Sequence, residues 1–259
     1  MGQKIDSRAM IGSSAKIADN VKIGPYAIIA DNAEIGEGTV IEPFAQVLGH
    51  TKVGCNCHIF SQAVVGSIPQ DLKYKGEKSY LVIGDRNRIR EFVTINPGTE
   101  KEAKTIIGND NLIMAYSHIA HDCVIGDENV FANGSTLAGY VDVGRNAVVG
   151  GLVAIHQFCR LGDYSIVGGC SKVVQDIPPY SMCDGHPAVV RALNSVGLKR
   201  KKFPNQAIKD LKKAFKIIFF DNHSFAEAIK IVETTVNSAG QVKTLLNFVA
   251  ASKRGIGKK

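Results

Sequence analysis

The chain has 259 residues, of which 45% are hydrophobic and 21% are charged, a composition typical of a folded globular protein and not of a disordered one. No apolar run approaches the roughly 20 residues of a membrane helix and no cleavable signal pattern opens the chain, so we expect a cytoplasmic protein without stable membrane insertion. The net charge of +7 is uneven, because residues 190–259 hold 15 Lys and Arg against 4 Asp and Glu. This basic end predicts an anionic partner.

An aliphatic residue recurs at every sixth position from Ile5 to Val173. Of the 29 positions in this register, only Asp71, Glu77 and Lys101 are not apolar. Neither an amphipathic helix nor plain strand alternation has a period of six. A short strand followed by a turn does have it, and three such units close a triangular coil of about 18 residues whose interior the aliphatic side chains fill. The repeat therefore predicts stacked coils of parallel β-strands.

Two interruptions of the repeat, at about 66–82 and 96–106, keep the same register on either side. Because the phase is preserved, we interpret them as loops that leave an unbroken prism. The fold class predicted for residues 1–180 is an all-β parallel β-helix.

A breaker, Gln175–Pro179, ends the repeat, and the period then becomes helical. The following apolar residues share one helical face: Ile208, Leu211, Phe215, Ile218 and Phe219. Ser224 and Glu227 form a capping box for a second helix. A last helix is indicated by Leu245, Leu246 and Val249. We predict a small basic α-helical domain over residues 190–259.

Residues 18 apart lie one above the other in such a prism, about 4.8 Å apart. One outward column then runs His121, Gly139, Gln157. It places a titratable base beside a glycine with an exposed N–H, and Asp122 is next to the base and suited to orient its ring. A base and a preorganised N–H are what acyl transfer needs, since one takes the acceptor proton and the other stabilises the oxyanion.

A second column, Asn133, Gly151 and Gly169, consists of small residues. It would leave a groove in which a long alkyl chain lies.

Several long motifs resemble one known family. The residues Asn111–Gly126 read NLIMAYSHIAHDCVIG. Further matching motifs are Gln70–Tyr74, Ile83–Glu91, Thr136–Gly139, His156–Cys159 and Gly197–Arg200. Together they resemble the UDP-N-acetylglucosamine O-acyltransferases that begin lipid A synthesis in Gram-negative bacteria. The resemblance runs along the whole chain and implies that the β-helix is left-handed.

The resemblance also implies roles for individual residues. His121 matches the general base that deprotonates the 3-hydroxyl of the sugar, and Gly139 matches the oxyanion donor. Gly169 matches the position that measures acyl-chain length. Positions that match sugar-nucleotide contacts are Asp71, Lys73, His118, His156, Gln157, Asn194 and Arg200. The implied donor is an (R)-3-hydroxyacyl group on acyl carrier protein, the acceptor is UDP-N-acetylglucosamine, and the active form is a homotrimer with sites between adjacent prisms.

Three positions depart from the family pattern. Asn96 and Tyr140 stand where the best-known members carry His, and Lys201 replaces an Arg. Lys keeps a point charge but loses bidentate phosphate geometry. These departures leave open whether the acceptor is UDP-N-acetylglucosamine or a 3-amino analogue.

The cysteines and histidines also allow a metal-site interpretation. Some hexapeptide proteins are zinc carbonic anhydrases, and His118, His121 and His156 are available here. The motif Cys55–His58 lacks a second Cys pair that would complete a zinc set. Cys57, Cys123 and Cys159 fall at the small corner position of the repeat, which predicts packing. We favour the acyltransferase, with neither metal nor cofactor.

Two further alternatives concern the ends of the chain. A scaffold whose basic tail binds nucleic acid would use Lys199–Lys202, but no aromatic residues interleave with these charges. A related N-acyltransferase carries an extra N-terminal uridine-binding domain, whereas the repeats here begin at Ile5. We therefore expect no nucleic-acid partner and prefer the O-acyltransferase.

Overall fold

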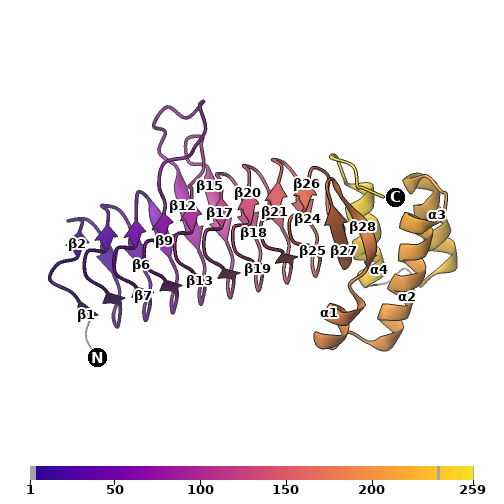
Figure 1. Cartoon of the computed structure of the whole chain (residues 1–259), viewed down its shortest axis with the longest axis horizontal. Helices are drawn as coiled ribbons and strands as arrows, with labels where there is room; N and C mark the ends of the chain where they lie inside the picture. Colours follow the sequence, from indigo (N-terminus) through magenta and orange to yellow (C-terminus); the bar gives the residue numbers. More distant parts are fainter. Residues whose placement is uncertain (1–3, 238–239, 259) are drawn as a thin grey trace.

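A computed structural model describes residues 4–237 and 240–258 of the chain. Residues 1–3, 238–239 and 259, which belong to the two expected domains, lie outside the described residues. Most of the chain forms a long three-sided prism of short parallel strands, with helices gathered at its C-terminal end (Figure 1).

Each side of the prism is one sheet. Sheet A contains β1 (Lys4–Ile5), β4 (Lys22–Ile23), β7 (Val40–Ile41), β10 (His58–Ile59), β13 (Arg88–Ile89), β16 (Leu112–Ile113), β19 (Val130–Phe131), β22 (Val148–Val149), β25 (Ile166–Val167), β27 (Ser181–Gly185) and β28 (Ala188–Leu193). Sheet B contains β2 (Met10–Ile11), β5 (Ile28–Ile29), β8 (Gln46–Val47), β11 (Val64–Val65), β14 (Thr94–Ile95), β17 (His118–Ile119), β20 (Thr136–Leu137), β23 (Ala154–Ile155) and β26 (Lys172–Val173). Sheet C contains β3 (Lys16–Ile17), β6 (Glu34–Ile35), β9 (Thr51–Val53), β12 (Tyr80–Ile83), β15 (Lys104–Ile107), β18 (Val124–Ile125), β21 (Asp142–Val143) and β24 (Arg160–Leu161).

The register of the strands follows the period of six. Leu137 pairs with Ile155, 18 residues on, whereas Ile95 pairs with Ile119 across the second loop. In most strands the second residue points inward and is buried, and the first faces outward. The predicted phase across both loops is therefore confirmed.

Small residues fill the inner corners. Cys57, Cys123 and Cys159 are all buried, as predicted. Burial raises the pKa of the Cys57 and Cys159 thiols to about 11, so these thiols are packing groups without nucleophilic character at neutral pH.

Two irregular segments leave the prism between sheets B and C, where they form the protrusion near β12 and β15 in Figure 1. They comprise residues 66–79 and 96–103. The expected loops, 66–82 and 96–106, end too late, because Tyr80 already pairs with Lys104 in sheet C.

The β-sheet continues beyond the repeat. β27 pairs with β25 in parallel and with β28 in an antiparallel hairpin, which extends sheet A to Leu193. This hairpin was not predicted, because residues 181–193 have lost the six-residue period.

The C-terminal helices are α1 (Ser195–Arg200), α2 (Asn205–Phe215), the π-helical turn η1 (Lys216–Phe220), α3 (Phe225–Thr235) and α4 (Gln241–Ala250). The predicted apolar face of α2 and η1 is buried, and the capping box of Ser224 and Glu227 is present. Among the described residues, no helix is long and apolar enough to cross a membrane.

Candidate functional site

Most predicted site residues lie along one corner of the prism, where the chain passes from sheet B to sheet C. This corner consists of the loops 66–79 and 96–103, followed by the turns 120–123, 138–141 and 156–159. Because every one of these segments follows a strand of sheet B, they stack along one edge. The two loops thereby stand beside the predicted column of His121, Gly139 and Gln157.

His121 lies between two carboxylates at this corner, and one of them, Asp122, is hydrogen-bonded to its ring. Its Nδ1 lies 2.9 Å from Asp122 Oδ2, and its Nε2 lies 3.8 Å from Asp71 Oδ2. Only 12% of the His121 side chain and 9% of the Asp122 side chain are exposed. The Asp122 carboxylate accepts the Nδ1 proton, so the tautomer with a free Nε2 lone pair is favoured. Asp71, on the first loop, faces that lone pair.

Gly139 lies directly against the His121 ring. A Cβ added to Gly139 would come 2.4 Å from His121 Cε1 and 2.6 Å from Nε2. The φ angle of Gly139 is not in the left-handed region, so glycine is required here for space and not for backbone conformation. The stacking that the 18-residue rule predicted is confirmed.

The Gly139 N–H has no partner within residues 4–237 and 240–258. The same turn position at another corner shows where this N–H points. Asn109 and Arg145 each donate their N–H to the carboxylate one coil on, at 2.6 and 2.9 Å respectively. The N–H at this position is therefore directed toward the side chain in the following coil, and at Gly139 no described residue accepts it.

The second loop supports the carboxylate that holds His121. The N–H and hydroxyl of Thr99 both contact Asp122 Oδ2, at 3.1 and 2.7 Å. Tyr140 packs edge-on against the His121 ring with a centroid distance of 5.3 Å, and its hydroxyl oxygen lies 3.2 Å from Thr99 Oγ1. Asn96 fastens the two loops together, since its amide nitrogen donates to Ser67 and Ile68.

Four other predicted residues lie at or near this corner. His118 faces outward from β17, and its Nδ1 is 2.7 Å from Thr94 Oγ1. Burial lowers the pKa of His118, and the neighbouring His121 lowers it too, partly offset by Thr94. Lys73 is exposed on the first loop. His156 and Gln157 are exposed at the end of the column, where His156 Nδ1 also lies 3.3 Å from an Arg254 nitrogen.

Asn194 and Arg200 belong to the helical end instead. The Asn194 side chain is buried as the N-cap of α1, accepting from the Gly197 N–H at 2.9 Å and donating to the Tyr164 carbonyl. Arg200 is exposed at the end of α1. Lys201 forms an ion pair with Glu128 at 2.6 Å.

Gly151 and Gly169 lie at a different corner, where the chain passes from sheet A to sheet B. A Cβ added to Gly169 would contact only the Gly151 backbone, at 3.3 Å from its carbonyl oxygen, and one added to Gly151 would contact only the Asn133 carbonyl. The predicted floor of small residues is therefore present and open outward.

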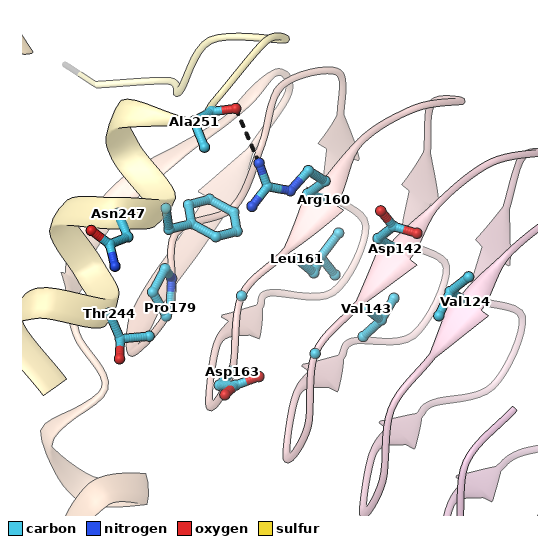
Figure 2. Close-up of a pocket in the computed structure, with 13 residues that line it drawn as sticks. Val124, Asp142, Val143, Arg160, Leu161, Asp163, Pro179, Thr244, Asn247 and Ala251 are labelled. Atoms are coloured by element: carbon cyan, nitrogen blue, oxygen red, sulfur yellow. Dashed lines mark hydrogen bonds between the residues drawn. The ribbon is translucent and has the colours of Figure 1, made fainter. Parts of the chain in front are cut away.

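A groove of about 550 Å³ lies elsewhere, between α4 and the outer face of sheet C (Figure 2). Val124, Asp142 and Arg160 line one side, and Phe248 and Ala251 line the other. None of the predicted site residues borders it. Among the described residues, no group of three or more His, Cys, Asp or Glu side chains is arranged to hold a metal ion.

Thr99 carries no sequence signal that assigns it to the site, and Tyr140 and Asn96 stand out in the sequence only as departures from the family pattern. The 18-residue rule fails across the second loop, where Thr94 pairs with His118 at a spacing of 24. A residue about 24 positions after Thr99 lies in the turn 120–123, which contains Asp122, so the corrected spacing places Thr99 beside that turn.

Comparisons with known proteins agree with this architecture. Residues 176–257 match the family model of UDP-N-acetylglucosamine O-acyltransferase domain 2, and residues 104–139 match the bacterial transferase hexapeptide model. The acyl-[acyl-carrier-protein]–UDP-N-acetylglucosamine O-acyltransferase of Aliarcobacter butzleri is 47% identical over 79% of this chain and 78% of its own length. The namesake from Helicobacter pylori is 44% identical over 82% and 78%.

Solved structures show the same fold over nearly the whole chain. LpxA from Acinetobacter baumannii superposes with a TM-score of 0.95 and 41% identity, covering 98% of this chain and 99% of that one. The UDP-N-acetylglucosamine O-acyltransferase of Moraxella catarrhalis gives a TM-score of 0.94 at 42% identity, with the same coverage. The predicted fold, a β-helix followed by helices, is confirmed.

Proposed function

Since the chain belongs to the UDP-N-acetylglucosamine O-acyltransferase family, we propose that it transfers an (R)-3-hydroxyacyl group from acyl carrier protein to the 3-hydroxyl of UDP-N-acetylglucosamine, the first step of lipid A biosynthesis. The observation that carries this proposal is the contact between His121 and Gly139. It puts a carboxylate-oriented base beside a free backbone donor.

In the first step His121 acts as general base. Its Nε2 takes the proton of the sugar hydroxyl while the oxygen attacks the thioester carbonyl, and the Nδ1 proton stays hydrogen-bonded to Asp122. The charge that develops on the carbonyl oxygen is stabilised by the Gly139 N–H. When the tetrahedral intermediate collapses, the C–S bond breaks and the imidazolium returns its proton to the carrier's thiolate.

The sugar nucleotide is held by groups around this base. Asp71 faces His121 Nε2 from 3.8 Å and is suited to accept a hydrogen bond from a second sugar hydroxyl, next to the one that reaches the base. Lys73 supplies a nearby positive charge, and His118, His156 and Gln157 present polar atoms along the same edge. Arg200 is exposed at the helical end and would reach the same ligand from another subunit, whereas the buried Asn194 side chain caps α1 and would position that helix.

We propose a homotrimer for this geometric reason. His121 is at the corner between sheets B and C, whereas Gly151 and Gly169 are at the corner between sheets A and B. One prism therefore does not line a single groove with both His121 and the two glycines, whereas two prisms packed side by side would. Outward residues of sheet A, such as Val130, Val148 and Ile166, offer a partly exposed apolar surface for such packing.

One assay tests the proposal. Purified protein is mixed with UDP-N-acetylglucosamine or its 3-amino analogue and a panel of 3-hydroxyacyl carrier proteins, and the products are read by mass spectrometry. We expect a 3-O-acylated sugar nucleotide with the hydroxyl acceptor. Acylation of the 3-amino analogue alone would show that the acceptor is the amine and not UDP-N-acetylglucosamine. The absence of an acylated product from both acceptors would overturn the proposed reaction.

A further inference from the structure

Thr99 is a buried residue of the second loop that contacts the His121–Asp122 pair from behind. Only 7% of it is exposed. Its hydroxyl oxygen lies 2.7 Å from Asp122 Oδ2 and 3.2 Å from the Tyr140 hydroxyl. Its N–H also reaches Asp122 Oδ2, at 3.1 Å. No role for Thr99 follows from the repeat or from the reaction as proposed so far.

The direction of these hydrogen bonds follows from the groups involved. An ionised carboxylate only accepts, so the Thr99 hydroxyl donates its single proton to Asp122. The Tyr140 hydroxyl then donates to Thr99. Asp122 Oδ2 thus receives three donors, namely the Thr99 hydroxyl, the Thr99 N–H and His121 Nδ1. The result is a chain from Tyr140 through Thr99 and Asp122 to His121.

Anchoring of the loop does not require this hydroxyl. The N–H of Asn96 donates to the Ile119 carbonyl, and the N–H of Gly98 donates to the Tyr80 carbonyl. The Glu102 N–H donates to the Lys78 carbonyl at 2.8 Å. The Asn96 side chain adds bonds to the first loop. These contacts hold the backbone on both sides of Thr99, so the hydroxyl itself is free to serve Asp122.

We infer that Thr99 is a positioning residue, whose hydroxyl, oriented by Tyr140, fixes the Asp122 carboxylate so that His121 keeps its proton on Nδ1 and its lone pair on Nε2. This inference rests on the proposed function, because it concerns the base of that reaction. A carboxylate without this donor would rotate more freely and hold the imidazole less firmly. Thr99 acts through Asp122 and touches no substrate.

The test compares Thr99→Val, which keeps the shape and loses the hydroxyl, with Thr99→Ser, which keeps it. We expect Thr99→Val to lower kcat about 10- to 100-fold, as for one charge-assisted hydrogen bond, with KM for both substrates unchanged. Thr99→Ser should restore most of the rate. In ¹⁵N-histidine NMR spectra, the Nδ1–H tautomer of His121 should lose population in Thr99→Val only. Thr234→Val, on α3, is the matched control.

A double-mutant cycle with Asp122→Asn decides whether Thr99 acts through that carboxylate. We expect Thr99→Val to cost no further activity once Asp122 is changed. Three results would overturn the inference. The first is an unchanged kcat in Thr99→Val, and the second is an equal loss of kcat in Thr99→Val and Thr99→Ser. The third is a full additional loss of activity when Thr99→Val is combined with Asp122→Asn. Failure of the proposed function appears separately, as a wild-type enzyme without acyl transfer or a His121→Ala variant with full activity.

Discussion

The imidazole of His121 occupies the space that a side chain at Gly139 would need, since a Cβ there would lie 2.4 Å from the ring. The two residues are 18 apart in the sequence and belong to neighbouring coils. The same glycine therefore admits the base and presents a free N–H next to it. Both consequences are open to experiment.

Gly139→Ala should lower kcat by at least 100-fold, because the added methyl displaces the ring from the donor. The fold should tolerate the change, since the atoms to be moved belong to a side chain at an outer corner. Gly151→Ala, at the equivalent turn position of another corner, controls for stability by its melting temperature. A kcat near the wild-type value would show that His121 and Gly139 do not act together.

Gly169→Met should shorten the accepted acyl chain. A Cβ at this position meets only the Gly151 backbone, which leaves room for the rest of the Met side chain to extend into the proposed groove. Each methylene that is no longer buried costs about 0.8 kcal/mol, so the ratio of rates with long and short donors should shift by orders of magnitude. Gly169→Ala should give a smaller shift in the same direction. Identical ratios in all three folded proteins would remove Gly169 from chain-length selection.

Arg200→Glu should raise KM for the acyl carrier protein, with a smaller effect as salt is added. The reason is that residues 190–259 hold 15 basic against 4 acidic residues, and acyl carrier proteins are acidic. Lys201 is less suitable, because its ion pair with Glu128 would also be lost.

A 3-hydroxyacyl pantetheine thioester, which lacks the carrier protein, serves as the control donor. At saturating nucleotide, its use by Arg200→Glu should match the wild type. A rise in KM for the nucleotide alone, with KM for the acyl carrier protein unchanged, would leave Arg200 only its proposed nucleotide contact and contradict a role in carrier binding.

His118 should make the protein less stable in mild acid. Burial lowers the pKa of His118 below its ordinary value of 6.5, so the unfolded chain binds this proton first as pH falls. The free energy of unfolding is therefore highest above pH 6.5 and decreases below it, until pH passes the folded pKa. Melting temperatures from pH 7.5 to 5 should fall less for His118→Gln than for wild type. Parallel curves would contradict this assignment.

The period of six was sufficient to predict the coils, the phase across both loops and the contact of His121 with Gly139, because a repeat fixes which residues stack. It could not predict the hairpin of β27 and β28, whose residues lack the period. Nor did it reach Thr99, because the second loop changes the spacing between coils from 18 to 24. Thr99 reaches Asp122 because the tertiary contacts of the second loop place it there, and these contacts leave no periodic signal in the sequence.

The most direct test of the central claim is the turnover number of His121→Ala with UDP-N-acetylglucosamine and a 3-hydroxyacyl carrier protein, with His223→Ala as the matched control. We expect a loss of roughly two to four orders of magnitude, the usual contribution of a positioned general base, in a protein with the wild-type melting temperature and oligomeric state. Near-normal turnover in a clean preparation of His121→Ala would contradict the proposed mechanism.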